Sequence, residues 1–128
     1  MLTDSPSILI TDDDRQFRET VRDILQPEGF RTLVAGDGAE AFEIVQTEEV
    51  HVVLLDMHMP RLTGLETLQM VKQYKALLPC ILLSAELDEE VRAAAERERA
   101  FSVLRKPVSR IDLTSVVRQA LSTTYGWN

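Results

Sequence analysis

VHVVLLD, residues 50–56, is the stretch of sequence that decides the predicted fold. Its residues are nearly all apolar, without regular alternation of apolar and polar positions, and CILLSA, residues 80–85, has the same character. An alternating strand buries only one face, whereas a short, nearly continuous apolar run is typical of a strand covered on both faces. The two stretches therefore predict a parallel sheet with helices on both sides.

Similar apolar runs predict a sheet of five strands. The predicted strands are Ile8–Thr11, Thr32–Ala35, Val50–Leu55, Ile81–Ser84 and Phe101–Arg105. Around them, apolar residues recur at the spacing of amphipathic helices, in stripes that begin at Phe17, Ala41, Leu65, Val91 and Leu113. Five strands alternating with five helices predict a doubly wound, flavodoxin-like α/β fold, with residues 1–128 as a single domain.

Local signals predict the start and the end of the first helix and the end of the last helix. Asp14 is expected to cap the start of the first helix, and Pro27 with Gly29 is expected to end it. The last residues, STTYGWN, are expected to trail off the final helix, as a natural tail or as the stub of a longer protein.

Composition narrows the class of protein. At 128 residues, with 45% hydrophobic residues, the chain can bury the core of one domain. No stretch approaches the roughly 20 apolar residues of a membrane span, and the first residues, MLTDSPS, lack the basic and apolar regions of a secretion signal. The single cysteine, Cys80, excludes an internal disulfide and is expected to be buried. We therefore expect a cytoplasmic protein without membrane contact, and the net charge of −7 argues against direct nucleic-acid binding.

Polar residues with complementary chemistry stand at the ends of the predicted strands. Asp12 and Asp13 follow the first strand, and Asp56 follows the third. Ser84 ends the fourth strand, and Lys106 follows the fifth. In an open parallel sheet, ligands bind beyond the carboxyl ends of the strands. These five side chains are therefore expected to meet at one edge of the sheet.

The run of aspartates in ILITDDD, residues 8–14, allows two interpretations. Such a run at a strand–helix junction is often only a capping and solvation feature. Alternatively, it is held for a cation, because closely packed carboxylates repel one another unless positive charge lies among them. The agreement of four strand ends favours a magnesium-dependent phosphoryl site: Mg²⁺ prefers oxygen ligands, Lys106 suits a phosphoryl group, and Asp56 would be its nucleophile.

These motifs resemble the receiver domain of two-component response regulators over essentially the whole chain. The family pattern stands here as ILITDD, LLDMHMPRLTG, ILLSA and LRKP, in the family's order. The resemblance implies a phosphorelay switch rather than a turnover enzyme. Asp56 would accept a phosphoryl group from a histidine kinase or a histidine phosphotransfer protein, and partner proteins would read the change on the fourth helix, fifth strand and fifth helix.

The resemblance also implies a set of Mg²⁺ ligands. Asp13 would be the principal ligand, with Asp12 assisting, often through water. Asp56 and the backbone carbonyl of His58 would complete the protein's share, while the His58 side chain is expected to face solvent.

Two further residues would act on the phosphoryl group itself. The resemblance implies that the Ser84 hydroxyl hydrogen-bonds a phosphoryl oxygen and that Lys106 pairs with the group. It also implies a cis bond between Lys106 and Pro107, a form that X–Pro bonds adopt at modest cost.

The chain departs from the family at four positions outside the phosphorylation chemistry. Val103 stands where an aromatic residue usually acts as a rotating switch, and Val108 replaces a common Phe. Thr63 replaces a frequent Asp, and Arg99 stands where a Gly often ends the fourth helix. These positions bear on the coupling between the site and the surface that partners read.

Two other functions are compatible with these residues. The first is a degenerate receiver that binds partners without being phosphorylated, which a titration with beryllium fluoride and Mg²⁺ would distinguish. The second is a small phosphatase of the haloacid dehalogenase type, because Asp12 and Asp14 lie two residues apart as in its nucleophile motif. Turnover of a phosphomonoester that is lost in Asp12→Ala but kept in Asp56→Ala would favour the phosphatase.

Overall fold

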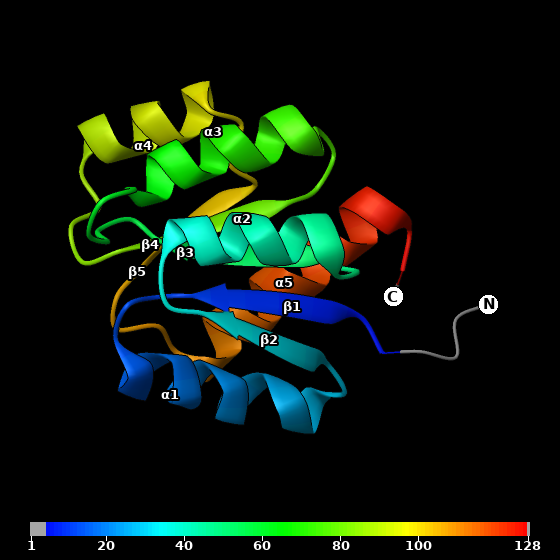
Figure 1. Cartoon of the computed structure of the whole chain (residues 1–128). Coiled ribbons are helices and arrows are strands. Elements are labelled where there is room, and N and C mark those ends of the chain that lie inside the picture. The colour runs from blue at the N-terminus through cyan, green and yellow to red at the C-terminus, as the bar shows by residue number, and fades with distance from the viewer. Residues whose placement is uncertain (1–4, 128) are drawn as a thin grey trace.

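The computed structural model of the chain describes residues 5–127, in which strands and helices alternate (Figure 1). The strands are β1 (Ser7–Thr11), β2 (Arg31–Ala35), β3 (Val52–Asp56), β4 (Cys80–Ser84) and β5 (Ser102–Arg105). The helices are α1 (Arg15–Leu25), α2 (Gly38–Thr47), α3 (Gly64–Tyr74), α4 (Glu89–Arg97) and α5 (Arg110–Tyr125), with a 3₁₀ turn, η1 (Gln26–Glu28), after α1.

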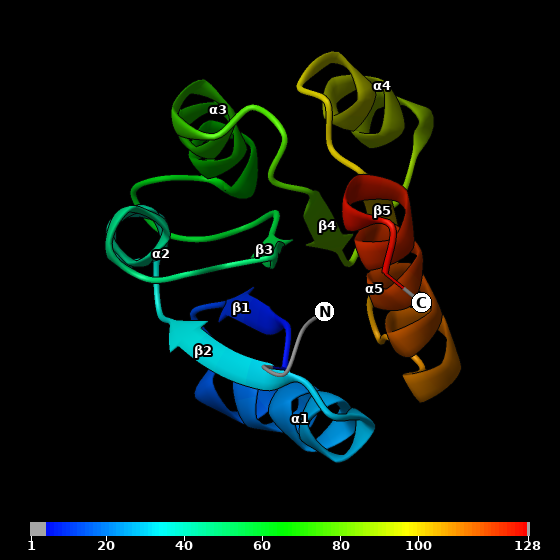
Figure 2. The ribbon, with the colours of Figure 1, turned by 90° about the vertical axis from the view of Figure 1, so that its right-hand side faces the viewer.

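The strands form one parallel sheet in the order β2-β1-β3-β4-β5. Figure 2 shows α1 and α5 on one face of this sheet and α2, α3 and α4 on the other. Alternate residues of β1 enter the two core layers, because Ile8 and Ile10 pack on the α1 and α5 side and Leu9 packs on the opposite side. The predicted doubly wound, flavodoxin-like fold is confirmed.

The predicted strand boundaries agree with the structure to within a few residues, and the shift at β3 has a physical cause. This strand begins at Val52, which pairs with Ile8, and it continues through Asp56. His51, just before it, accepts the Ser7 backbone N–H on its imidazole Nδ1 at 2.8 Å. The polar side chain therefore binds the end of the neighbouring strand instead of entering a core layer.

Helix ends follow the predicted local signals. Asp14 caps α1 by accepting the backbone N–H groups of Gln16 and Phe17 at 2.9 and 3.3 Å, a contact that stabilises a helix by about 1 kcal/mol. The first helix ends before η1, and Gly29 then adopts a φ of +94°, which favours glycine. Arg99, after α4, adopts a φ of +63° although it is not glycine.

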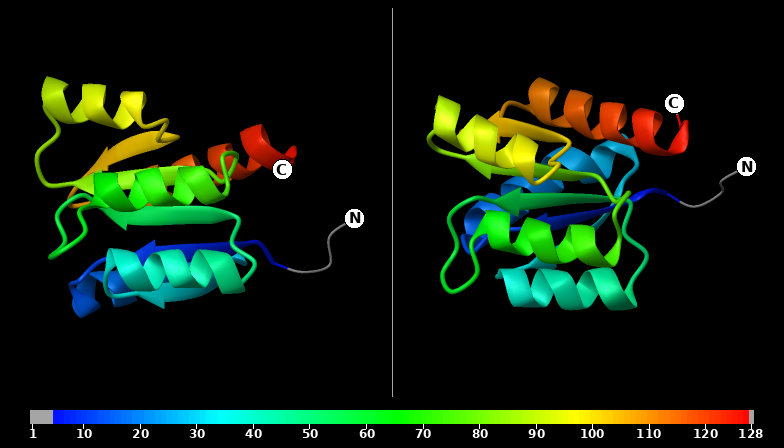
Figure 3. Two further views of the ribbon diagram at one scale, coloured as in Figure 1. Left: turned by 45° about the horizontal axis from the view of Figure 1, so that its top comes forward. Right: turned by 90° about the horizontal axis from the view of Figure 1, so that it is seen from above.

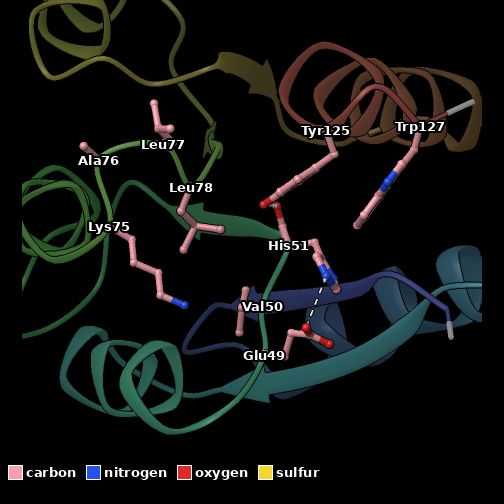
Figure 4. Close-up of a pocket in the computed structure, with 9 residues that line it drawn as sticks. All are labelled: Glu49, Val50, His51, Lys75, Ala76, Leu77, Leu78, Tyr125 and Trp127. Atoms are coloured by element: carbon pink, nitrogen blue, oxygen red, sulfur yellow. Dashed lines mark hydrogen bonds and ion pairs between the residues drawn. The ribbon is translucent and has the colours of Figure 1, made fainter. Parts of the chain in front are cut away.

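The prediction that STTYGWN trails off the last helix is wrong for residues 122–125, and Asn128 lies outside the described residues. Helix α5 continues to Tyr125, whose hydroxyl donates to the His51 carbonyl at 2.8 Å. The rings of Tyr125 and Trp127 stack with centroids 4.6 Å apart, and both meet the His51 ring edge-on (Figure 4). These rings line one side of a groove of about 540 Å³, which also includes residues 75–78. This aromatic cluster ties the end of the chain to the start of β3, whereas residues 1–4 of MLTDSPS lie outside the described residues.

His51 is expected to make the stability of the fold depend on pH. Burial, reinforced by Lys75 and opposed by Glu49, lowers the pKa of His51 below its ordinary value of 6.5. A histidine with a lowered folded-state pKa contributes stability above the unfolded-state value, and this contribution is lost as the pH falls through the folded-state pKa. We expect the free energy of unfolding to fall more steeply between about pH 7 and pH 5 in the wild type than in His51→Gln, which keeps an acceptor but does not titrate. Denaturant titrations would measure both slopes, and equal slopes would contradict the prediction.

Two expectations from composition can be compared with the structure. Cys80 is a buried free thiol, as predicted, and burial raises its pKa to about 12. Within residues 5–127, no helix combines the length and the apolar character that crossing a membrane requires.

Candidate functional site

The predicted site residues lie at the carboxyl edge of the sheet. Figure 3 shows the strand arrowheads at one edge, opposite the end at which α5 finishes. Asp12 directly follows β1, Asp56 is the last residue of β3, and Ser84 is the last residue of β4. Lys106 directly follows β5 and precedes a cis bond to Pro107, so the expected cis bond is confirmed. Parallel strand order thus brings together residues that are far apart in the sequence.

The acidic residues among them form a compact cluster. Asp12, Asp13 and Asp56 each offer a carboxylate oxygen within 4.8 Å of the others. Asp12 and Asp56 are buried, whereas Asp13 is exposed at the mouth of the cluster. Every donor in the cluster is a carboxylate oxygen, and this donor set suits a small, hard cation such as Mg²⁺ better than zinc.

Lys106 supplies the positive charge inside the cluster. Its Nζ donates to Asp12 Oδ2 at 2.7 Å and lies 3.2 Å from Asp56 Oδ1. Burial alone would lower the pKa of Lys106, but its hydrogen bond with Asp12 and the charges of Asp12 and Asp56 raise it above the ordinary value. Lys106 is therefore an ammonium ion at neutral pH.

Asp56 is held in an unfavourable environment for its own charge. Burial and the neighbouring Asp12 carboxylate raise the pKa of Asp56, although Lys106 and the His58 backbone N–H oppose this change. The His58 N–H lies 3.4 Å from Asp56 Oδ1, and the His58 side chain is exposed, as predicted. Additional positive charge near Asp56 would favour its ionised, nucleophilic form.

The first two of the three aspartates after β1 are bonded differently. Asp12 uses both carboxylate oxygens within the protein: Oδ1 accepts the Asp14 backbone N–H at 2.9 Å, and Oδ2 accepts from Lys106. The exposed Asp13 carboxylate accepts no hydrogen bond from any described residue. Asp13 can therefore turn toward a cation without breaking a contact, whereas Asp12 cannot.

Ser84 lies at the same sheet edge, but its hydroxyl is bonded to its own loop. Its Oγ donates to the Glu86 carbonyl at 2.6 Å and accepts the Glu86 N–H at 3.2 Å. Ser84 is fully buried, so its hydroxyl has to exchange these partners to reach a group bound at Asp56.

The loop between Asp56 and α3 depends on a close backbone approach at Gly64. The Gly64 N–H donates to the Met57 carbonyl at 3.0 Å. A Cβ atom at Gly64 would overlap the Asp56 carbonyl oxygen and lie 2.8 Å from Met57 Cα. Thr63, which precedes Gly64, starts α3 with a capping box completed by Glu66, so the departure from aspartate keeps a working cap.

Two residues of α1 contact the site without having been predicted as part of it. The Phe17 ring centroid lies 4.3 Å from Lys106 Nζ. The Arg18 guanidinium donates to the Asp12 carbonyl at 2.7 Å. Phe17 belongs to the apolar stripe of the first helix, and this stripe indicates burial but not which charged group the ring faces.

Comparison with known proteins identifies a family match over most of the chain. The sequence model of the response regulator receiver domain matches residues 8–118. Response regulator MprA of Mycobacterium ulcerans is 34% identical over 120 residues, which are 94% of this chain and 52% of MprA. This chain therefore spans about half the length of the curated relatives that it matches.

Solved structures match at the level of the whole fold. The chemotaxis protein CheY4 of Vibrio cholerae superposes with a TM-score of 0.88 at 27% identity, covering 91% of this chain and 99% of CheY4. The response regulator protein TrrA of Thermotoga maritima, in complex with Mg(2+)-BeF, has a TM-score of 0.83 at 28% identity, covering 91% of this chain and 99% of TrrA.

Proposed function

This chain belongs to the response regulator receiver domain family, and on that premise we propose that it is a phosphoacceptor switch whose acceptor is Asp56. The observation that most supports the proposal is the contact of the Lys106 ammonium with Asp56 at 3.2 Å, beside two further carboxylates. The charges that phosphoryl transfer needs are thus present around one buried carboxylate.

The chain's own residues have distinct roles in this proposal. An Asp56 oxygen attacks the phosphorus of a phosphohistidine, so that an O–P bond forms, the N–P bond breaks, and its electron pair stays on the imidazole nitrogen. Lys106 then pairs with the phosphoryl group. The Ser84 hydroxyl leaves the Glu86 carbonyl to donate to a phosphoryl oxygen, and this exchange moves the loop after β4. In-line transfer of this kind depends mainly on positioning and charge neutralisation.

Magnesium is the metal that this site would hold. Asp13, Asp12, Asp56 and the His58 carbonyl are its proposed ligands, and the carboxylate cluster of the first three supports the choice. Bound Mg²⁺ would neutralise charge on the phosphoryl oxygens.

The test of this function is direct phosphorylation of the whole chain. We expect acetyl phosphate with Mg²⁺, or a phosphorylated histidine phosphotransfer protein, to add one phosphoryl group per chain in intact mass spectra. Absence of the adduct with both donors would contradict the proposal and leave a degenerate receiver. The receiver-domain match does not favour a haloacid-dehalogenase-type phosphatase.

Mg²⁺ affinity tests the proposed order of ligands. We expect binding in the ~millimolar range, because a site with few protein ligands leaves the ion several waters. Asp13→Ala should weaken binding more than Asp12→Ala, since the Asp13 carboxylate accepts no hydrogen bond from residues 5–127 whereas Asp12 is already bonded to Lys106. Calorimetry is more suitable than tryptophan fluorescence, because Trp127 packs against His51 at the opposite end of the sheet, far from the proposed metal site.

The matched control for this titration is Asp14→Asn. It removes an adjacent carboxylate outside the cluster, and asparagine caps a helix about as well as aspartate. Affinity should therefore stay near the wild-type value in this control, and equal losses in Asp13→Ala and Asp14→Asn would indicate nonspecific electrostatics instead of a ligand.

Partners follow from the same proposal. The phosphoryl donor is a histidine kinase or a histidine phosphotransfer protein, and a downstream protein reads the surface of α4, β5 and α5. We propose that the exchange takes place in the cytoplasm, where a free thiol such as Cys80 stays reduced.

A further inference from the structure

We infer that Phe17 is a positioning residue for Lys106: its ring holds the ammonium group beside Asp56 before the phosphoryl group arrives. The inference rests on the proposed function of Asp56 and Lys106. It assigns a role in that function to a residue of α1 that is neither a proposed metal ligand nor a proposed partner of the phosphoryl group.

Lys106 Nζ contacts two carboxylates and one aromatic ring. An ammonium group has three N–H bonds. One is directed to Asp12 Oδ2 at 2.7 Å, and Asp56 Oδ1 lies 3.2 Å away. The remaining side of Nζ faces the Phe17 ring, whose centroid is 4.3 Å distant. The cation is thus in contact with two carboxylates and one aromatic face, and the Lys106 side chain remains 21% exposed.

The ring contributes more than apolar contact. An aromatic face carries negative charge density and attracts a cation that lies within about 6 Å of its centroid. Lysine has a flexible four-carbon stem that loses considerable rotamer freedom when its ammonium is held in one place. A ring that already holds Nζ at the site lowers the entropic cost of positioning the Lys106 side chain during phosphoryl transfer.

Phe17 is itself held firmly enough to serve this purpose. Its backbone N–H donates to the Asp14 carboxylate in the first turn of α1. Its side chain is partly buried against the core layer shared by α1 and α5. The support for Lys106 therefore comes from a capped helix and not from a loop.

The experiment compares replacements that keep or remove the aromatic face. Phe17→Leu retains apolar bulk but has no ring, and we expect phosphorylation by acetyl phosphate with Mg²⁺ to slow about 2- to 30-fold, the range of a cation–π contact. Phe17→Tyr restores a ring and should rescue most of the rate. A loss of rate in Phe17→Tyr equal to that in Phe17→Leu would overturn the inference.

Phe30→Leu is the matched control for lost packing. Phe30 lies in the same core layer and contacts another cation, with the Arg118 guanidinium 5.2 Å from its ring centroid. Its replacement removes a ring of the same size away from Lys106, so the phosphorylation rate should stay near the wild-type value. An equal slowing in Phe30→Leu and Phe17→Leu would reduce Phe17 to a structural residue.

Two readouts connect the effect to Lys106. In NMR spectra of the unphosphorylated protein, the Lys106 ε-methylene protons should be shifted upfield by the ring in the wild type and in Phe17→Tyr, and this shift should vanish in Phe17→Leu. In a Lys106→Met background, Phe17→Leu should have no further effect on the residual rate. The absence of a ring shift in the wild type would overturn the inference. This NMR test does not require phosphorylation, so its outcome is separate from that of the proposed function.

Discussion

Asp56→Asn is expected to abolish phosphorylation of the chain by acetyl phosphate or by a phosphohistidine donor. The substitution keeps the size of the side chain but removes the anionic oxygen that attacks phosphorus. Asp56 is a buried carboxylate that ends β3 and contacts Lys106, whereas both oxygens of the other buried carboxylate of the cluster, Asp12, already accept hydrogen bonds within the protein. Intact mass spectrometry on both proteins should show one phosphoryl group on the wild type and none on the variant.

Asp14→Asn is the control for this experiment, because it removes a charge near the site and keeps the cap of α1. It should be phosphorylated like the wild type. Equal labelling of Asp56→Asn and Asp14→Asn would place the acceptor elsewhere.

Although Asp56→Asn should abolish phosphorylation, it should make the fold more stable. The pKa of Asp56 is raised in the folded state, chiefly by burial, so its ionised form destabilises the fold at neutral pH. Asp56→Asn should therefore unfold at higher denaturant concentration than the wild type at pH 7. The difference should shrink as the pH falls through the raised pKa toward the unfolded-state value, because protonated wild type then carries the same charge as the variant.

The fold could be predicted because its signals are local and redundant. Continuous apolar runs such as residues 80–85 identify strands covered on both faces, and parallel order follows from the helices between them. The end of the chain was predicted wrongly because local signals cannot reveal a contact with a residue distant in sequence. Tyr125 and Trp127 are held by His51, a residue distant in sequence, and no local pattern indicates that contact.

For the candidate site, the sequence predicted which residues lie together but not which hydrogen bonds they make. The strand-end rule brings Asp12, Asp56 and Lys106 to one edge, but it does not reveal that Lys106 already occupies one oxygen of Asp12. It also does not reveal that the Ser84 hydroxyl is bonded to Glu86. These are choices among hydrogen-bond partners a few ångströms apart, and they depend on side-chain packing that spacing along the chain does not specify.

Gly64→Ala is expected to cause a large loss of stability, because the loop between Asp56 and α3 leaves no room for a methyl group at this position. The added Cβ would overlap the Asp56 carbonyl oxygen and lie 2.8 Å from Met57 Cα, and because both of these neighbours are backbone atoms, the loop before α3 has to move. Overpacking of this kind costs about 1–3 kcal/mol, and more where the neighbour cannot yield. Because the displaced segment begins at Asp56, the rate of phosphorylation should fall as well.

Gly36→Ala is the matched control, since Gly36 lies in the loop after β2 at the same edge of the sheet. Its added Cβ would meet only the ends of the Arg18 and Glu40 side chains, at 3.6 and 3.7 Å, which is ordinary van der Waals contact. Denaturant unfolding should therefore give a small change for Gly36→Ala and a large one for Gly64→Ala, and intact mass spectra should show slower labelling only for Gly64→Ala. If Gly64→Ala were as stable as the wild type, the loop would have a second conformation of equal energy, and the position of Asp56 would not depend on the Gly64 contact. If it lost stability but kept its labelling rate, the contact would support the fold without positioning the acceptor.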